Sequence, residues 1–154
     1  MTSMELVRDP ADPRHWVLDG VGTLLRTDRM SRAATAEAGG RTWKIVRHGW
    51  IRTGFRSTDA TGAVVGERSP KDAEALRWSD RSLVLRRDGR ERGGYVLLDG
   101  DRALATMTPK REGKRPLNVS VDDPTLDPGL LLFMAFIVQA YADDASFNTG
   151  PTGV

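Results

Sequence analysis

A long apolar segment towards the C-terminus constrains the fold of this chain more than any other feature. Asp127 and Pro128 precede Leu130–Ala142, in which Gln139 and the Tyr141 hydroxyl are the polar groups. Aspartate is a good helix N-cap and proline suits the first helical position, so the sequence predicts a helix over residues 128–143. Helical spacing spreads its apolar side chains over the whole circumference, and a helix that is apolar all round has to be enclosed.

The rest of the chain reads as short antiparallel strands. Turn signals such as Asp19-Gly20 and Asp99-Gly100 recur about every 8–12 residues, the spacing typical of an all-β domain. Arg41–Arg47 and Trp50–Ser57 alternate apolar and polar residues and are predicted to form a hairpin. We expect about ten strands, with Asp28–Gly40 as a loop or a short helix.

Geometry favours a barrel wrapped around the helix. About 16 helical residues span about 24 Å, close to the height of strands of about seven residues. The predicted fold class is therefore mainly β, an antiparallel closed barrel of about 10–12 strands around a hydrophobic C-terminal central helix. Two alternatives are a helix that pairs two chains and a helix that inserts into a membrane. The apolar run is shorter than the roughly 20 residues that a membrane span needs.

Length and composition bound the domain organisation. The 154 residues fit one domain at residues 13–145, with an N-terminal extension at 1–12 and a flexible C-terminal tail at 146–154. Cysteine is absent and no signal peptide is apparent, so we expect a cytoplasmic protein that is not transmembrane. The net charge of +2 is too small to indicate a nucleic-acid partner.

Three segments resemble those of the tubby C-terminal-like superfamily, which includes tubby domains, phospholipid scramblases and LURP-one-related proteins. Phe55–Val65 and Tyr95–Ala105 look like its strand–turn–strand units, and Asp127–Val138 looks like its terminal helix. The resemblance extends over Trp16–Ala145. It implies a twelve-stranded barrel around a hydrophobic central helix and a binding or scaffold role.

The sequence offers little catalytic chemistry. His15 and His48 without any cysteine make a poor zinc set, and the nucleophile elbow of serine hydrolases is missing. The acidic stretch from Asp122 to Asp127 is better explained as a helix-capping loop than as a calcium site. We expect no catalytic residue, no metal site and no cofactor.

Basic residues are the more suggestive feature. Side by side they could hold phosphate groups, although an ordinary charged outer face explains them as well. The candidate contacts with an anionic surface are Arg52, Arg56, Arg86, Arg87, Lys110, Arg111, Lys114 and Arg115. We therefore expect a non-enzymatic binding or scaffold domain, monomeric or homodimeric, that contacts anionic phospholipid head groups or a protein partner. The alternative is a small-ligand carrier or an enzyme with a pocket at the barrel mouth.

Overall fold

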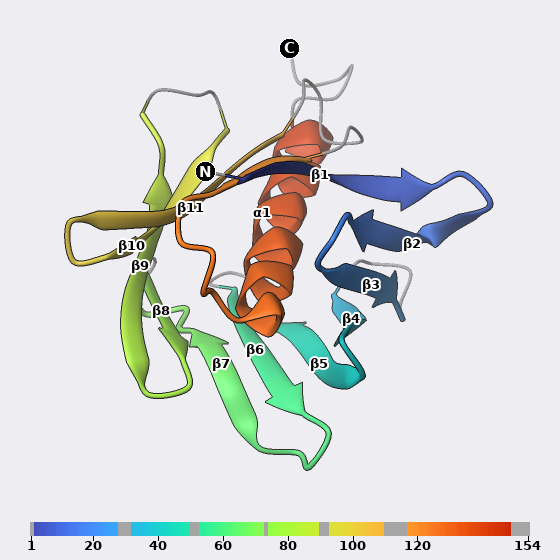
Figure 1. The fold of residues 1–154 in the computed structure, drawn as a ribbon, viewed down its shortest axis with the longest axis horizontal. Coiled ribbons are helices and arrows are strands. Elements are labelled where there is room, and N and C mark those ends of the chain that lie inside the picture. The colour runs from blue at the N-terminus through green and yellow to red at the C-terminus, as the bar shows by residue number, and fades with distance from the viewer. Residues whose placement is uncertain are drawn as a thin grey trace.

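The fold is a closed β-barrel with one helix running through it (Figure 1). A computed structural model describes residues 2–27, 32–49, 53–72, 74–89, 93–109 and 117–148, the last four of these by their backbone alone. The strands are β1 Thr2–Asp9, β2 Asp12–Leu18, β3 Gly22–Arg26, β4 Ala33–Ala38, β5 Arg41–His48, β6 Gly54–Asp59, β7 Val64–Arg68, β8 Ala75–Trp78, β9 Arg81–Arg87, β10 Tyr95–Asp99, β11 Arg102–Pro109 and β12 Leu117–Val121. They are followed by α1, Pro128–Asn148.

Each strand pairs antiparallel with the next one in the chain, from β1 to β12. The barrel closes where β1 lies between β2 and β12, with Leu6 opposite both Leu18 and Leu117. Because consecutive strands alternate in direction, all odd-numbered strands run towards the same end of the barrel. This arrangement confirms the predicted antiparallel closed barrel.

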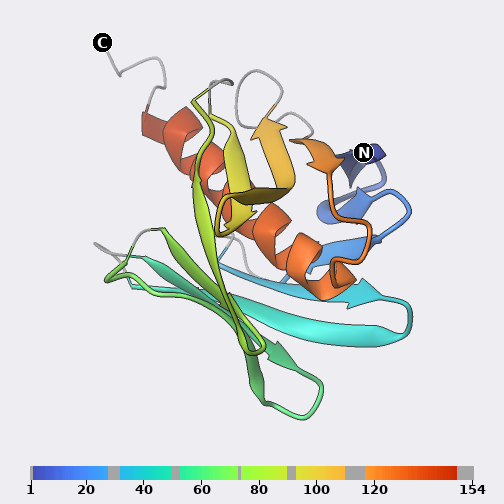
Figure 2. The same ribbon diagram turned by 60° about the vertical axis from the view of Figure 1, so that its left-hand side comes forward.

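The helix is enclosed, as its composition predicts. Every side chain from Leu130 to Ala140 is buried, and α1 packs against β3, β4, β5 and β11. Figures 1 and 2 show it passing through the barrel from one end to the other. Asp127 caps it, because its Oδ1 accepts a 2.9 Å hydrogen bond from the Gly129 amide. The helix continues to Asn148, five residues beyond the predicted end at 143.

Small residues let the helix approach the strands. A Cβ atom on Gly129 would lie 2.5 Å from Cζ2 of Trp43, and one on Gly66 would lie 2.7 Å from the Trp78 ring. On β4 the inward positions are Ala34 and Ala36, exposed by 2% and 0%, together with Ala38. Glycine and alanine therefore shape the wall that faces α1 as much as the large apolar residues do.

The strand β4 corrects the prediction of a loop or short helix over Asp28–Gly40. The alanine-rich composition favours a helix on propensity alone. In the barrel, Ala36 lies opposite Leu24 on one side and Trp43 on the other, so pairing with two neighbours overrides that local preference.

Two other boundaries differ from the predicted ones. Residues 1–12 were expected to extend from the domain, whereas β1 occupies residues 2–9 and closes the barrel through its buried Leu6. The second strand of the predicted hairpin begins at Gly54, and Trp50 lies outside the described residues. In the predicted tail, residues 146–148 are helical and 149–154 lie outside the described part of the chain.

Candidate functional site

Five of the eight predicted anion contacts, Arg52, Lys110, Arg111, Lys114 and Arg115, lie outside the described residues. The other three are exposed on strands. Arg56 on β6 is 3.7 Å from Glu67, so a carboxylate accompanies its charge. Arg86 and Arg87 end β9, and neither has a carboxylate partner within the described part of the chain. Because successive side chains of a strand point to opposite faces, Arg86 and Arg87 project to different sides of the wall, and the three described candidates do not form a cluster.

The direction of the strands gives the barrel two different mouths. We call the end where α1 finishes the C-terminal mouth, and the end where α1 begins the N-terminal mouth. The odd-numbered strands finish at the C-terminal mouth, since Arg26 and Arg47 near the ends of β3 and β5 contact the last turns of α1. The same strands start at the N-terminal mouth, where Arg41 of β5 contacts Asp127.

Five arginines share one position at the C-terminal mouth. Side chains of a strand alternate between the inner and outer faces of the barrel. On five odd-numbered strands, the last residue at an inner-face position is an arginine: Arg8, Arg26, Arg47, Arg68 and Arg87. We call this set the arginine arc. On β11 the equivalent position is Pro109, so the arc spans the strands from β1 to β9. Inward parity at a strand end directs these side chains towards the end of α1 rather than to the outer wall.

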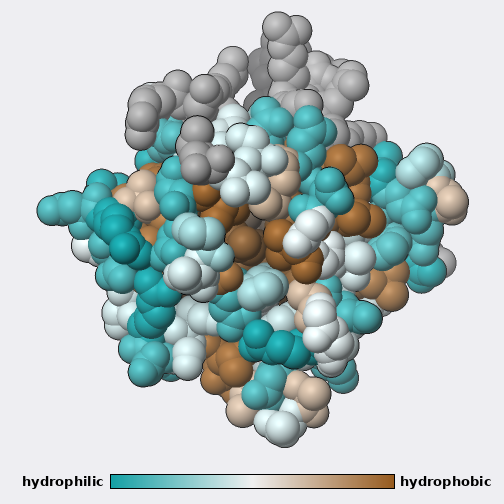
Figure 3. Space-filling model, in the orientation of Figure 1, coloured by the Kyte–Doolittle hydropathy of each residue, from teal (hydrophilic) through white to brown (hydrophobic). Residues whose placement is uncertain are grey.

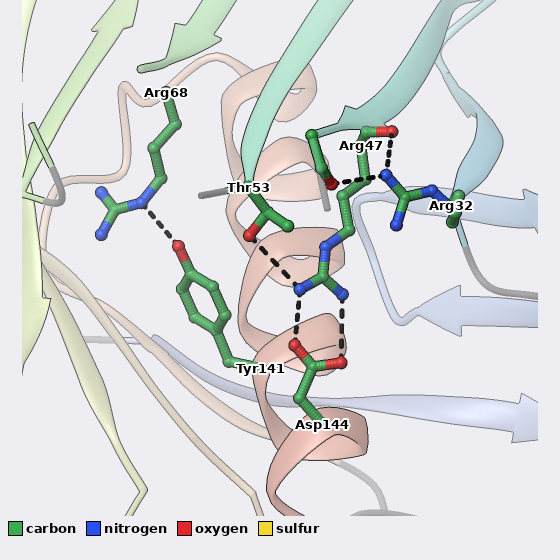
Figure 4. A network of polar contacts seen from close by, with 7 residues as sticks. Arg32, Arg47, Thr53, Arg68, Tyr141 and Asp144 are labelled. Atoms are coloured by element: carbon green, nitrogen blue, oxygen red, sulfur yellow. Dashed lines mark hydrogen bonds and ion pairs between the residues drawn. The ribbon is translucent and has the colours of Figure 1, made fainter. Parts of the chain in front are cut away.

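Two members of the arc hold the end of the helix. Arg47 faces Asp144 with both terminal nitrogens, and its Nη1 lies 3.1 Å from Oδ1 (Figure 4). Arg26 donates a 2.9 Å hydrogen bond to Asp143, which also accepts one from Gln139. Carboxylates in the last turns of a helix oppose its macrodipole. The two arginines supply the positive charge that this position requires.

A third member lies deeper in the barrel. Arg68 is 3% exposed, and its Nε donates a 2.9 Å hydrogen bond to the hydroxyl of Tyr141 (Figure 4). Its Nη2 donates to the Leu85 carbonyl on β9. The ring of Tyr141 packs edge-on against Phe55 and close to Tyr95. This aromatic layer separates the apolar core from the charged rim.

The last two members carry uncompensated charge. Arg8 and Arg87 are exposed, and neither is within ion-pair distance of a carboxylate in the described segments. Arg8 lies across from Trp16, with its guanidinium carbon 5.8 Å from the centre of that ring. Arg87 lies across from Tyr95. The turns of the same mouth also carry carboxylates, among them Asp9, Asp72 and Asp88. Arg8 and Arg87 nevertheless keep exposed guanidinium groups suited to bidentate contact with phosphate or carboxylate.

The N-terminal mouth has the opposite character. Its turns and the end of β4 present five exposed carboxylates with no ion pair among the described residues: Asp19, Glu37, Asp80, Asp101 and Asp122. Hydrogen bonds from the Thr61 and Thr125 hydroxyls hold the pKa of Asp59 and of Asp123 below the ordinary aspartate range. The N-terminal mouth therefore presents unpaired carboxylates, whereas the C-terminal mouth presents the arginine arc among the carboxylates of its own turns.

An open groove of about 370 Å³ lies at the N-terminal mouth. Arg41 pairs with both oxygens of Asp127 across it, and the Trp78 indole donates a 3.3 Å hydrogen bond to the same carboxylate. The two indoles that line the groove, Trp43 and Trp78, are almost fully buried against Gly129. The groove is thus built mainly from groups that anchor the start of α1.

Charged and polar side chains cover most of the outer face seen in Figure 3, and apolar groups gather near its centre. No three His, Asp or Glu side chains in the described ranges are placed to share a metal ion. Of the helices that the structure describes, none has the length and apolarity to cross a membrane. Searches against protein-family models, curated proteins and solved structures find no match to this chain.

Sequence reasoning missed four of the five arc residues because it looked for runs of basic residues. The signal that would have found them is positional: one arginine at the end of every second strand, in phase with buried residues such as Leu6, Leu24, Ile45 and Leu85. Reading that signal requires the strand boundaries and the face of each strand to be correct first.

Proposed function

We propose that this chain is a non-enzymatic binding domain whose C-terminal mouth contacts anionic phospholipid head groups. The observation that carries the proposal is the arginine arc: five arginines lie at equivalent ends of alternate strands. Arg68 is buried, whereas Arg8 and Arg87 are exposed and face no described carboxylate. A guanidinium presents its donors in a planar fork that matches a phosphate group. Each basic side chain near an anionic leaflet contributes about 1 kcal/mol.

The packing of the barrel supports contact at a rim. Side chains of α1 occupy the interior from Leu130 to Ala140, so ligands reach the protein from its outside or its mouths. The strands hold the arc residues in fixed register around α1, which lowers the entropy lost when they engage a surface. Exposed guanidinium groups held by the strands at this mouth suit contact with a broad anionic surface.

Kinship with the tubby-like superfamily is part of the proposal. The barrel with a hydrophobic C-terminal central helix is the architecture that the resemblance implied, and it supports the kinship without establishing it. We accordingly propose a cytoplasmic protein that binds peripherally to a membrane.

Vesicle flotation tests the proposal. The wild-type chain is expected to float with phosphatidylcholine vesicles that contain one fifth phosphatidylserine, and to float less at high salt, because screening shortens the range of the attraction. Vesicles of phosphatidylcholine alone are expected not to bind it. No flotation at low salt would remove the proposal.

A charge-matched pair of variants tests the location of the contact. Replacing Arg8→Gln and Arg87→Gln removes two charges from the arc and is expected to weaken binding by about tenfold to thirtyfold. The control, Lys44→Gln with Arg77→Gln, removes two exposed charges from outward positions on β5 and β8. Equal weakening by both pairs would show that net charge alone, rather than the arc, drives binding.

The groove at the N-terminal mouth favours a second candidate function, the carriage or turnover of a small ligand. Its volume of about 370 Å³ suits a small molecule. Since Trp43 and Trp78 line it, a bound ligand is expected to change tryptophan fluorescence. A fragment screen in which no compound alters the wild-type emission at saturating concentration would argue against this function.

A further inference from the structure

The geometry points to an internal competitor at the C-terminal mouth. Asp143 and Asp144 of α1 form ion pairs with Arg26 and Arg47, in the position that a head-group phosphate would take. Binding of an anion there therefore displaces the end of the helix. This inference rests on the proposed function and adds its regulation. The occupant of two arc positions is a segment of the chain itself, and it carries the same charge as the proposed ligand.

The contacts have the form of anion recognition. Arg47 holds Asp144 through both terminal nitrogens, the fork geometry by which arginine binds carboxylate or phosphate. Arg26 holds Asp143 at 2.9 Å. Asp144 is 49% exposed and Arg47 only 11% exposed, so the carboxylate is the partner that can leave towards solvent.

The arginines have supports that do not involve the helix aspartates. Arg47 donates a 3.3 Å hydrogen bond to Thr53, and its guanidinium carbon lies 5.5 Å from the centre of the Phe55 ring. The guanidinium carbon of Arg26 lies 5.4 Å from the centre of the Trp16 ring. These contacts keep both side chains at the rim when the carboxylates depart, which leaves a preorganised site for an incoming anion.

The end of the helix gains from the same pairs. Without Arg26 and Arg47, two carboxylates would sit at the end of α1 where the macrodipole is unfavourable to negative charge. Release is expected to stop at Tyr141, because its ring packs against Phe55 and its hydroxyl accepts a hydrogen bond from the buried Arg68. Anion binding is thus coupled to loosening of the residues after Tyr141 and not of the buried part of α1.

Two charge-matched variants test the competition. Asp143→Asn with Asp144→Asn removes the competitor, and Asp101→Asn with Asp122→Asn removes two exposed carboxylates at the opposite mouth. We measure flotation with the vesicles of phosphatidylcholine and phosphatidylserine. The first pair is expected to bind about tenfold more tightly than the wild type, and the control pair within about threefold of it.

Hydrogen exchange on the wild-type chain gives a second measurement that needs no substitution. With the same vesicles, the backbone amides of residues 142–148 are expected to exchange faster, while those of residues 131–138 stay protected. Slower exchange at the helix end on binding would overturn the inference.

The flotation outcomes separate the two proposals. If the wild type binds and Asp143→Asn with Asp144→Asn binds no better than the control pair, the competition is refuted and the proposed function stands. If only the variant without the competitor binds, the competition is supported, and the proposed function of the wild-type chain is overturned. If neither binds, both proposals are overturned.

Discussion

The replacement Gly129→Ala tests whether the start of α1 is wedged between two indoles. In a helix, alanine is favoured over glycine by up to about 1 kcal/mol, so propensity alone predicts a more stable protein. The structure predicts the opposite. A Cβ atom at this position would lie 2.5 Å and 2.6 Å from two carbons of Trp43 and 2.9 Å from Cζ2 of Trp78.

Neither indole has room to retreat. Trp43 is 2% exposed and Trp78 is 4% exposed, and the Trp78 indole nitrogen is hydrogen-bonded to Asp127. Overpacking of this kind costs about 1–3 kcal/mol. After subtraction of the propensity gain, we expect the variant to lose about 1 kcal/mol in its free energy of unfolding, and at most about 2 kcal/mol.

Urea unfolding followed by tryptophan fluorescence measures this loss as a lower midpoint at unchanged slope. The control is Gly89→Ala, because a Cβ atom there meets nothing within 4 Å. That variant is expected to be neutral or slightly more stable than the wild type. A Gly129→Ala protein as stable as the wild type would refute the wedge.

Three further expectations follow from the packing and the turns. Asp127→Ala removes the helix cap together with the partner of Arg41 and Trp78, and it should lower the unfolding free energy by about 1–2 kcal/mol in urea; an unchanged midpoint would contradict the capping role. Thr61→Val removes the hydroxyl that lowers the pKa of Asp59, so NMR titration should find that pKa higher, and an unchanged value would refute the assignment. Because a lowered carboxyl pKa stabilises the fold above the ordinary aspartate range and this contribution fades as pH falls, the same variant should lose stability at neutral pH and little in acid. Phe133→Ala leaves a cavity at a fully buried site beside Trp78 and should lower the free energy of unfolding by about 3–5 kcal/mol. The control is Val64→Ala on the exposed start of β7. A difference below about 1 kcal/mol between the two variants would show that the core collapses around the gap.

The central helix was predictable because its evidence is local. The segment from Leu130 to Ala142 is apolar on every side, and that pattern alone requires strands around it. The strands β1 and β4 were not predictable in the same way. Ala34 and Ala36 carry no strand preference, and their place in the wall follows from the space that α1 needs next to them.

The sequence predicted that basic residues form the candidate site, but not where in the fold they gather. Basic residues were named as candidate contacts with an anionic surface, and Arg87 was among them. Arg8, Arg26, Arg47 and Arg68 are far apart in sequence, and none of them is adjacent to another arginine or to a lysine. Their common position depends on strand direction and on the closure of the barrel, which local patterns do not report. The pairing of Asp143 and Asp144 was equally invisible, since their partners lie on β3 and β5.

The order of elements has a consequence for biosynthesis. The twelve strands precede α1 in the chain, so the strands leave the ribosome before the helix that fills the barrel. Until α1 emerges, a nascent chain can form hairpins between neighbouring strands but exposes the apolar side chains meant for the helix. Completion of this fold therefore waits for translation to pass Asn148, and chaperones that shield apolar surfaces have their greatest use during that interval.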